Sequence, residues 1–132
     1  MYSVGITNSL RASHALSGDI GDETLPHEHE YRVEWRCSAD DLDGNGFAVD
    51  ISAMELLLDE LVRELDGRFL NELPFFRGIQ VSVENLSRYL LESLFARLDR
   101  PSCKSITSSE IRIWESDTAW ASYCSAPEGA GL

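Results

Sequence analysis

A strict two-residue alternation in HEHEYRVEWRC (residues 27–37) constrains the fold of this chain more than any other feature. Tyr31, Val33, Trp35 and Cys37 follow one another at every second position, and polar residues stand between them. Side chains two residues apart in a β-strand share one face of the sheet. The stretch is therefore predicted to be a strand with one buried face, which another layer of the fold has to cover.

The spacing of apolar residues changes to a helical period in the middle of the chain. A first helix is predicted over about residues 51–65, with Ser52 as its N-cap and Gly67 as its stop. A second helix is predicted from about residue 83 to residue 98, and Pro101 is expected to prevent its continuation. The segment between the two helices reads as a partly buried loop.

Further strand signals lie near both ends of the chain, at residues 2–16, 105–116 and 119–125. The order ββααββ predicts an α+β domain, a four-stranded antiparallel sheet with two helices on one face. We expect one domain over residues 1–125 and a disordered tail over residues 126–132.

The charge balance excludes several classes of partner. The formal net charge is -12, from 23 acidic and 11 basic residues. A nucleic-acid groove or an anionic membrane surface would need clustered lysine and arginine, so neither is expected. The sequence has no apolar run long enough for a bilayer, no signal peptide pattern and no CxxC among its three cysteines. These features favour a cytoplasmic protein with reduced thiols.

The stretch DDLDGNG resembles the opening of a calcium-binding EF-hand loop, with Asp41, Asp43, Asn45 and Gly46 at matching positions. The twelfth position, where such a loop needs a bidentate glutamate, is Ser52. A strand rather than a helix is predicted before it, so we interpret the stretch as a turn.

All three histidines fall within sixteen positions, at His14, His27 and His29. His27 and His29 share one face of the predicted strand, and His14 can meet them if the first two strands pair. Three neutral imidazoles with one open position are typical of a catalytic zinc site. The alternatives are a chance surface group or a hydrogen-bonded core histidine. Glu28 and Glu30 point to the opposite face, as solvent-facing or supporting groups.

Six stretches of the chain occur in the order of a known family pattern. They are ASH ending at His14, HEHEY at 27–31, GFAVDI ending at Ile51, LDGRFLN at 65–71, SVENL at 82–86 and WES at 114–116. The sequence resembles the 6-pyruvoyl-tetrahydropterin synthase family, which includes the 6-carboxytetrahydropterin synthases. The resemblance implies the tunnelling fold, a homo-hexamer built as a dimer of trimers, and pterin sites at subunit interfaces.

The resemblance also implies roles for individual residues. The three histidines would be the zinc ligands, and Glu115 would anchor the pterin, because a carboxylate accepts two hydrogen bonds at once. Ser82 and Glu84 match positions that contact the pterin. Other roles remain open: Glu115 as an exposed charge at a strand end, Ser82 and Glu84 as helix-capping groups, and Asp50 as the residue that begins its helix.

The chain departs from the family pattern at two catalytic positions. Glu23 stands where the family has a catalytic cysteine, and ETLPHEH resembles a subgroup that uses glutamate there to form 6-hydroxymethyl-dihydropterin. Asp66 matches the aspartate of a proton-relaying Asp-His pair, but Gly67 replaces the histidine. Glu23 is the expected base and Asp66 the second catalytic residue; the alternative for Glu23 is one more solvated acid of the loop.

The predicted function is a zinc-dependent pterin lyase that acts on 7,8-dihydroneopterin triphosphate or a close relative. A pterin-binding homologue that keeps zinc but has lost turnover is the alternative, and an acidic interaction domain without zinc is a third hypothesis. Arg11, Arg32 and Arg68 are candidate phosphate contacts or ordinary surface arginines.

Overall fold

The predicted strand at residues 27–37 is the second strand of a four-stranded antiparallel sheet. The computed structural model describes residues 1–127. In it β1 (Tyr2–His14) and β2 (His27–Ala39) pair over their full 13-residue lengths. β3 (Ser108–Trp114) and β4 (Trp120–Ser125) complete the sheet in the order β1-β2-β3-β4. Of the expected tail, residues 128–132 lie outside the described residues.

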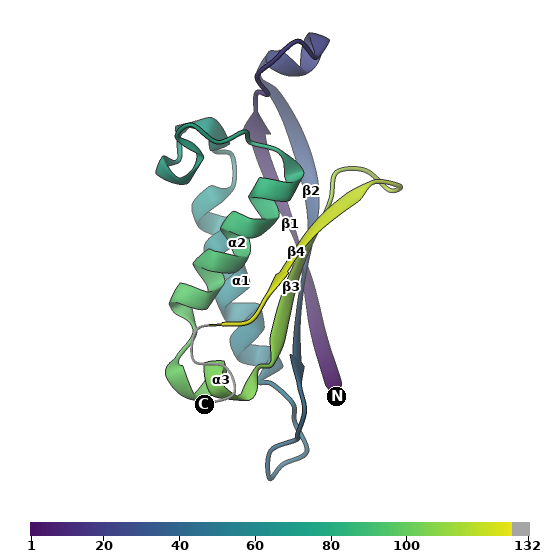
Figure 1. The fold of residues 1–132 in the computed structure, drawn as a ribbon, viewed down its shortest axis with the longest axis vertical. Helices are drawn as coiled ribbons and strands as arrows, with labels where there is room; N and C mark the ends of the chain where they lie inside the picture. The colour runs from purple at the N-terminus through teal and green to yellow at the C-terminus, as the bar shows by residue number, and fades with distance from the viewer. Residues whose placement is uncertain (128–132) are drawn as a thin grey trace.

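Two long helices cover one face of this sheet (Figure 1). α1 (Ile51–Leu65) packs against β1, and α2 (Val83–Arg97) packs against β3 and β4. The predicted α+β fold with ββααββ order is therefore confirmed. A short third helix, α3 (Arg100–Ser105), was not predicted from the sequence. Within the described residues, no helix combines the length and hydropathy that crossing a membrane requires.

The apolar face of β2 forms the centre of the core. Tyr31, Val33, Trp35 and Cys37 have no exposed surface. Each buried side chain of this size contributes about 1.5–3 kcal/mol to folding. The leucines of both long helices pack onto this face, which explains the alternation in β2 and the helical period of the segments that cover it.

The helix limits correct two expectations. The N-cap of α1 is Asp50, whose carboxylate accepts a hydrogen bond from the Ala53 amide at 3.2 Å, so Ser52 is not the cap. α2 ends at Arg97, within one residue of its predicted end, so Pro101 is not what stops it. Pro101 instead occupies the first turn of α3, where a missing amide hydrogen costs nothing.

Residues 69–79 are more ordered than the predicted loop. Two turns of 3-10 helix, Leu70–Glu72 and Pro74–Phe76, bury Leu70 and Phe76 in the hydrophobic core. A third 3-10 turn, Gly21–Thr24, lies in the connection between β1 and β2.

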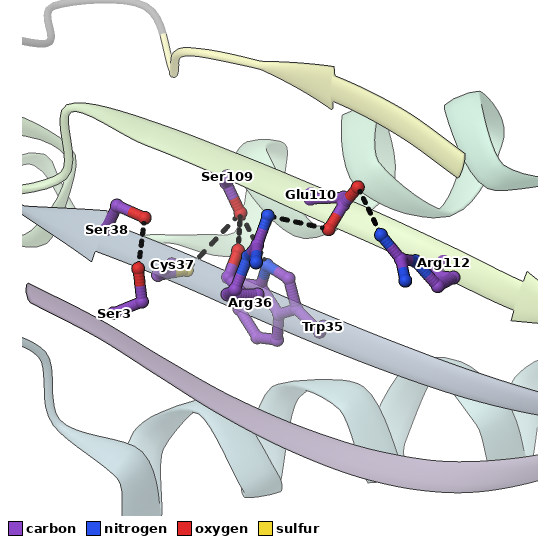
Figure 2. Close-up of polar contacts among 8 residues, drawn as sticks. All are labelled: Ser3, Trp35, Arg36, Cys37, Ser38, Ser109, Glu110 and Arg112. Carbon is purple, nitrogen blue, oxygen red and sulfur yellow. Dashed lines mark hydrogen bonds and ion pairs between the residues drawn. The ribbon is translucent and has the colours of Figure 1, made fainter.

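A buried polar network joins β2 to β3 beneath the helices (Figure 2). The Trp35 indole donates to the Ser109 hydroxyl at 2.8 Å, and this hydroxyl donates to the Arg36 carbonyl at 2.9 Å. The Cys37 sulfur lies 3.3 Å from the same hydroxyl, and burial raises the pKa of the Cys37 thiol to about 11. Ser109 thus satisfies polar groups that have no access to water.

The opposite face of the sheet carries paired charges instead (Figure 2). Glu110 lies between Arg36 at 2.9 Å and Arg112 at 3.4 Å. The Arg112 guanidinium also stacks over the Trp120 ring, 3.8 Å from its centroid. Opposite charges on neighbouring strands stabilise the sheet while keeping this face polar.

Candidate metal and pterin site

The three histidines meet at one end of the β1–β2 hairpin. His14 and His27 are direct cross-strand partners, and His29 is the next residue on the same face of β2. One possible ligand atom from each ring lies within 4.8 Å of the others, as the histidine spacing predicts. His14 is buried and the other two are half-buried, whereas Glu28 and Glu30 are exposed on the opposite face. We call these three residues the histidine triad.

Backbone carbonyls orient two rings of the histidine triad. His14 Nδ1 donates to the Val81 carbonyl at 2.7 Å, and His27 Nδ1 donates to the Leu25 carbonyl at 2.8 Å. A carbonyl only accepts, so each Nδ1 carries the hydrogen and each Nε2 keeps its lone pair. A carbonyl partner behind the ring is the usual arrangement of a metal-binding histidine.

The unpartnered nitrogens support a metal site. His14 Nε2 and His29 Nε2 are buried and have no hydrogen-bond partner among the described residues. Burial lowers the pKa of His14, so this ring is neutral at physiological pH and its lone pair is available. Three imidazole nitrogen donors with one open position suit zinc, and the residues present therefore fit that ion.

Two side-chain amides fix the chain just beyond His14. The Asn71 amide both donates to and accepts from the backbone of Ala15, each at 2.9 Å. The Gln80 amide pairs in the same way with the backbone of Ser17, again at 2.9 Å. These contacts hold the site end of β1 against the segment that supplies the His14 acceptor.

Glu115 lies beside the histidine triad. Its Oε1 is 3.4 Å from His29 Nε2, and its side chain is 38% exposed. Its backbone amide donates to the Ala119 carbonyl, which closes the β3–β4 turn at this position. The carboxylate predicted to anchor a pterin is thus next to the candidate metal site and open to a ligand on one side.

Ser82 and Glu84 begin α2 at the edge of the site. The Ser82 hydroxyl accepts from the Asn85 amide at 3.1 Å, which makes Ser82 the N-cap of α2. Glu84 is exposed in the first turn, where the negative charge of a carboxylate interacts favourably with the helix dipole. Ser82 follows directly after Val81, the acceptor of His14, and the one hydrogen bond of its side chain in the described chain is the helix cap.

Glu23 lies in the 3-10 turn between β1 and β2, beyond the His14–His27 pair. It is exposed, and its backbone carbonyl accepts from the Leu16 amide at 2.8 Å. No hydrogen bond or ion pair connects its side chain to the histidine triad within the described chain. Its position on the hairpin brings it to the same end of the molecule as the site.

Asp66 has a structural contact of its own. It follows the last residue of α1, and its Oδ1 accepts from the Arg11 amide at 3.1 Å. The neighbouring Gly67 amide donates to the Arg11 carbonyl at 2.6 Å. Asp66 therefore ties the end of α1 to β1, three residues before His14 along the strand.

Sequence reasoning assigned Tyr31 to the core and missed its place at the site. Its ring centroid lies 5.3 Å from that of His29 and 6.2 Å from that of His14. The side chain is fully buried, and its hydroxyl has no hydrogen-bond partner among the described residues. Burial and, secondly, the charge of Glu115 raise the pKa of Tyr31. Its position two residues after His29 on the same strand face was the available signal.

The EF-hand-like stretch is a turn, as predicted. The Asp43 carboxylate accepts from the amides of Asn45 and Phe47, at 2.8 and 3.0 Å. These hydrogen bonds lower the pKa of Asp43. The carboxylate thus stabilises its own loop.

Comparisons with known proteins agree with this geometry. The family model described as 6-pyruvoyl tetrahydropterin synthase matches residues 3–126. The *Caenorhabditis elegans* 6-pyruvoyl tetrahydropterin synthase structure is 18% identical, with 92% of this chain and 94% of that chain covered and a TM-score of 0.78. The *Plasmodium falciparum* synthase is 19% identical, with 94% and 98% covered and a TM-score of 0.77.

A *Plasmodium vivax* synthase with its catalytic glutamate replaced by alanine is also similar, at 18% identity, 95% and 98% coverage and a TM-score of 0.78. No curated protein sequence matches the chain significantly. The solved structures share the tunnelling fold of this chain, and the family model covers nearly its whole length. The chain therefore belongs to the 6-pyruvoyl tetrahydropterin synthase family.

Proposed function

We propose that this chain is a zinc-dependent pterin lyase that cleaves or eliminates within the side chain of 7,8-dihydroneopterin triphosphate or a close relative. The observation that carries the proposal is the pre-oriented histidine triad with Glu115 Oε1 only 3.4 Å from His29 Nε2. A pterin substrate presents side-chain oxygens for a metal and ring N–H groups for a carboxylate. The neighbouring imidazole nitrogens and carboxylate of this chain support the proposal, because they offer groups of both kinds.

His14, His27 and His29 are the proposed zinc ligands. Zinc bound there would polarise the side-chain oxygens and acidify the neighbouring C–H and O–H groups. The protein contributes fixed rings, since two Nδ1 hydrogens are already held by carbonyls. Because the rings of His14 and His27 are already held in place, less ordering of the ligands is needed when a metal binds.

Glu115 is the proposed pterin anchor. Its carboxylate can accept from the 2-amino group and from N3–H of the ring, which sets the orientation of the side chain toward the histidine triad. Ser82 and Glu84, at the start of α2 just after the His14 acceptor Val81, are proposed as weaker pterin contacts. The hydroxyl of Ser82 also serves the helix, which limits it to a shared role.

Glu23 is the proposed proton acceptor. It is solvent-exposed at the site end of the hairpin, and a similar *Plasmodium vivax* synthase is described as having a catalytic glutamate. Asp66 is proposed as a second catalytic residue that acts without a histidine, because Gly67 follows it. With this relay absent, most of the proton transfer falls to Glu23.

We propose a homo-hexamer, as in the family pattern, and a cytoplasmic location. β1 and β4 are the edge strands of the sheet. Within the described chain, no strand pairs with the outer edge of β4 or with most of the outer edge of β1. Exposed edges of this length are commonly closed by pairing with further copies. Cys37 and Cys124 are free thiols, which suits a reducing compartment.

A pterin-binding protein without turnover is the second candidate. It is favoured by Gly67, which removes the relay histidine, and by the absence of a described contact between the Glu23 side chain and the histidine triad. Such a protein would keep the roles of the histidines and of Glu115 while Glu23 had none.

One experiment separates the two candidates. Zinc-loaded protein is incubated with 7,8-dihydroneopterin triphosphate, and the pterin products are identified by mass. Glu23→Ala is compared with Asp22→Ala, which removes a neighbouring exposed acid of the same turn. We expect a 6-hydroxymethyl product from the wild type and from Asp22→Ala, and loss of product from Glu23→Ala with pterin affinity retained.

Other results would change the conclusion. Tight pterin binding without any product from the wild type would favour the binding protein. A pyruvoyl or carboxy product would refute Glu23 as a replacement for cysteine. Protein purified without a histidine tag should carry about one zinc per chain and lose it in His27→Ala; zinc-free protein that still turns over would refute the metal site.

A further inference from the structure

The Tyr31 hydroxyl is a buried polar group that the proposed mechanism does not use. The side chain has no exposed surface, and the hydroxyl has no hydrogen-bond partner among the described residues. Leaving a buried hydroxyl unpaired is unfavourable, and native proteins rarely do so without a reason. A phenylalanine would fill the same space without this penalty.

The Tyr31 ring belongs to the part of the core that packs against the histidine triad. It follows His29 by two residues on β2, so both side chains lie on the helix-covered face of the sheet. The two rings are 5.3 Å apart at an interplanar angle of 38°. The His14 ring is 6.2 Å away and nearly perpendicular, at 83°. The phenol is therefore packed against two of the three proposed metal ligands.

We propose that the Tyr31 hydroxyl donates a hydrogen bond to a side-chain oxygen of the pterin, which makes Tyr31 a residue that selects pterins with oxygenated side chains. This inference rests on the proposed function. A phenol is protonated at neutral pH and is a ready donor. An oxygen held at the histidine triad would supply the partner that the protein itself lacks.

The same reasoning predicts discrimination. A ligand with a side-chain oxygen satisfies the hydroxyl, whereas a ligand without one leaves it buried and unpaired. One neutral hydrogen bond corresponds to about a tenfold difference in affinity. Selectivity of this size would depend on the hydroxyl and not on the ring of Tyr31.

The test compares Tyr31→Phe with the wild type, both zinc-loaded. The probes are neopterin, which has a hydroxylated side chain, and unsubstituted pterin, with dissociation constants measured from pterin fluorescence. Tyr89→Phe is the matched control, because Tyr89 packs against Phe75 and Phe76 and has no ring contact with the histidine triad in the described chain. Zinc content and melting temperature are measured on every variant.

We expect neopterin to bind about tenfold more weakly to Tyr31→Phe, with pterin affinity and zinc content unchanged. Tyr89→Phe should match the wild type with both probes. The melting temperature of Tyr31→Phe should be unchanged or higher, because the substitution removes an unpaired buried group. Weaker ligand binding without lost stability is the signature of a ligand contact.

Three results would overturn the inference. Equal affinities of wild type and Tyr31→Phe for neopterin would show that the hydroxyl makes no ligand contact. Equal weakening with both probes, or lost zinc with a lower melting temperature, would show a structural role. A wild type that binds neither probe would refute the proposed function and this inference together, a result distinct from the first two.

Discussion

Replacing Ser109 by alanine tests how the two central strands are held together. Ser109 is 2% exposed, and the indole that donates to its hydroxyl belongs to Trp35, which is fully buried. In Ser109→Ala the indole N–H keeps no partner and cannot reach water. The Arg36 carbonyl loses the hydroxyl hydrogen as well.

The expected loss follows from these contacts. A buried donor left unpaired costs about 1–3 kcal/mol, and the small volume of one oxygen adds little. We expect the free energy of unfolding to fall by about 2 kcal/mol. With an unfolding entropy of about 2.1 cal/mol/K per residue, the melting temperature of a chain this long should fall by about 7 °C.

Urea and thermal unfolding measure the effect, with an unchanged m-value expected for a local change. Ser108→Ala is the control, because no hydrogen bond of its hydroxyl is found in the described chain and its side chain points to the opposite face. Ser109→Ala should cost much less in a Trp35→Phe background, where no indole donor remains. A loss below about 0.5 kcal/mol, or an equal loss in both backgrounds, would refute the reasoning.

Three further predictions concern the cap, the thiols and pH. Asp50→Ala should lower the free energy of unfolding by about 1 kcal/mol and Ser52→Ala by much less, in urea titrations; the reverse order would restore Ser52 as the cap. Alkylation at pH 8, mapped by mass spectrometry, should modify the exposed Cys124 in the folded protein. Cys37 should react only after unfolding, because it is buried and its pKa is raised to about 11. Early labelling of Cys37 would contradict its burial. Metal-free protein should lose stability as pH falls below 6.5. Burial lowers the pKa of His14 in the folded protein, so the unfolded chain takes up the proton first and is favoured at low pH. Equal urea midpoints at pH 7 and pH 5 would contradict this.

Long, regular patterns made the fold predictable. Trp35 and its neighbours on β2 alternate because one face of the strand is buried, and the sequence records that directly. The cap of α1 could not be chosen in the same way, because Asp50 and Ser52 are equally good caps two residues apart. α3 is only six residues long, too short for a period, and Pro101 suits a helix start as well as a helix stop.

The site was predictable where it depends on strand geometry. Pairing of β1 with β2 brings His14 opposite His27, and alternation adds His29. The orientation of the rings was not predictable, since the acceptor of His14 is a backbone carbonyl and every residue has one. The alternation placed Tyr31 in the core correctly, but a sequence does not distinguish a paired buried hydroxyl from an unpaired one.

The separation along the chain between the histidine triad and its supports has a consequence for the order of events during folding. The three histidines belong to one hairpin, whereas the contacts that orient this end of β1 come from residues 56 to 67 positions later in the sequence. Hairpins form within about 1–10 μs, and contacts between distant segments form later. A metal ion that binds the histidine triad as proposed would therefore meet these rings before the helices dock, and would cross-link the first two strands early in folding. Metal supply at the time of synthesis should then influence how much protein folds, and not only how much of it is active.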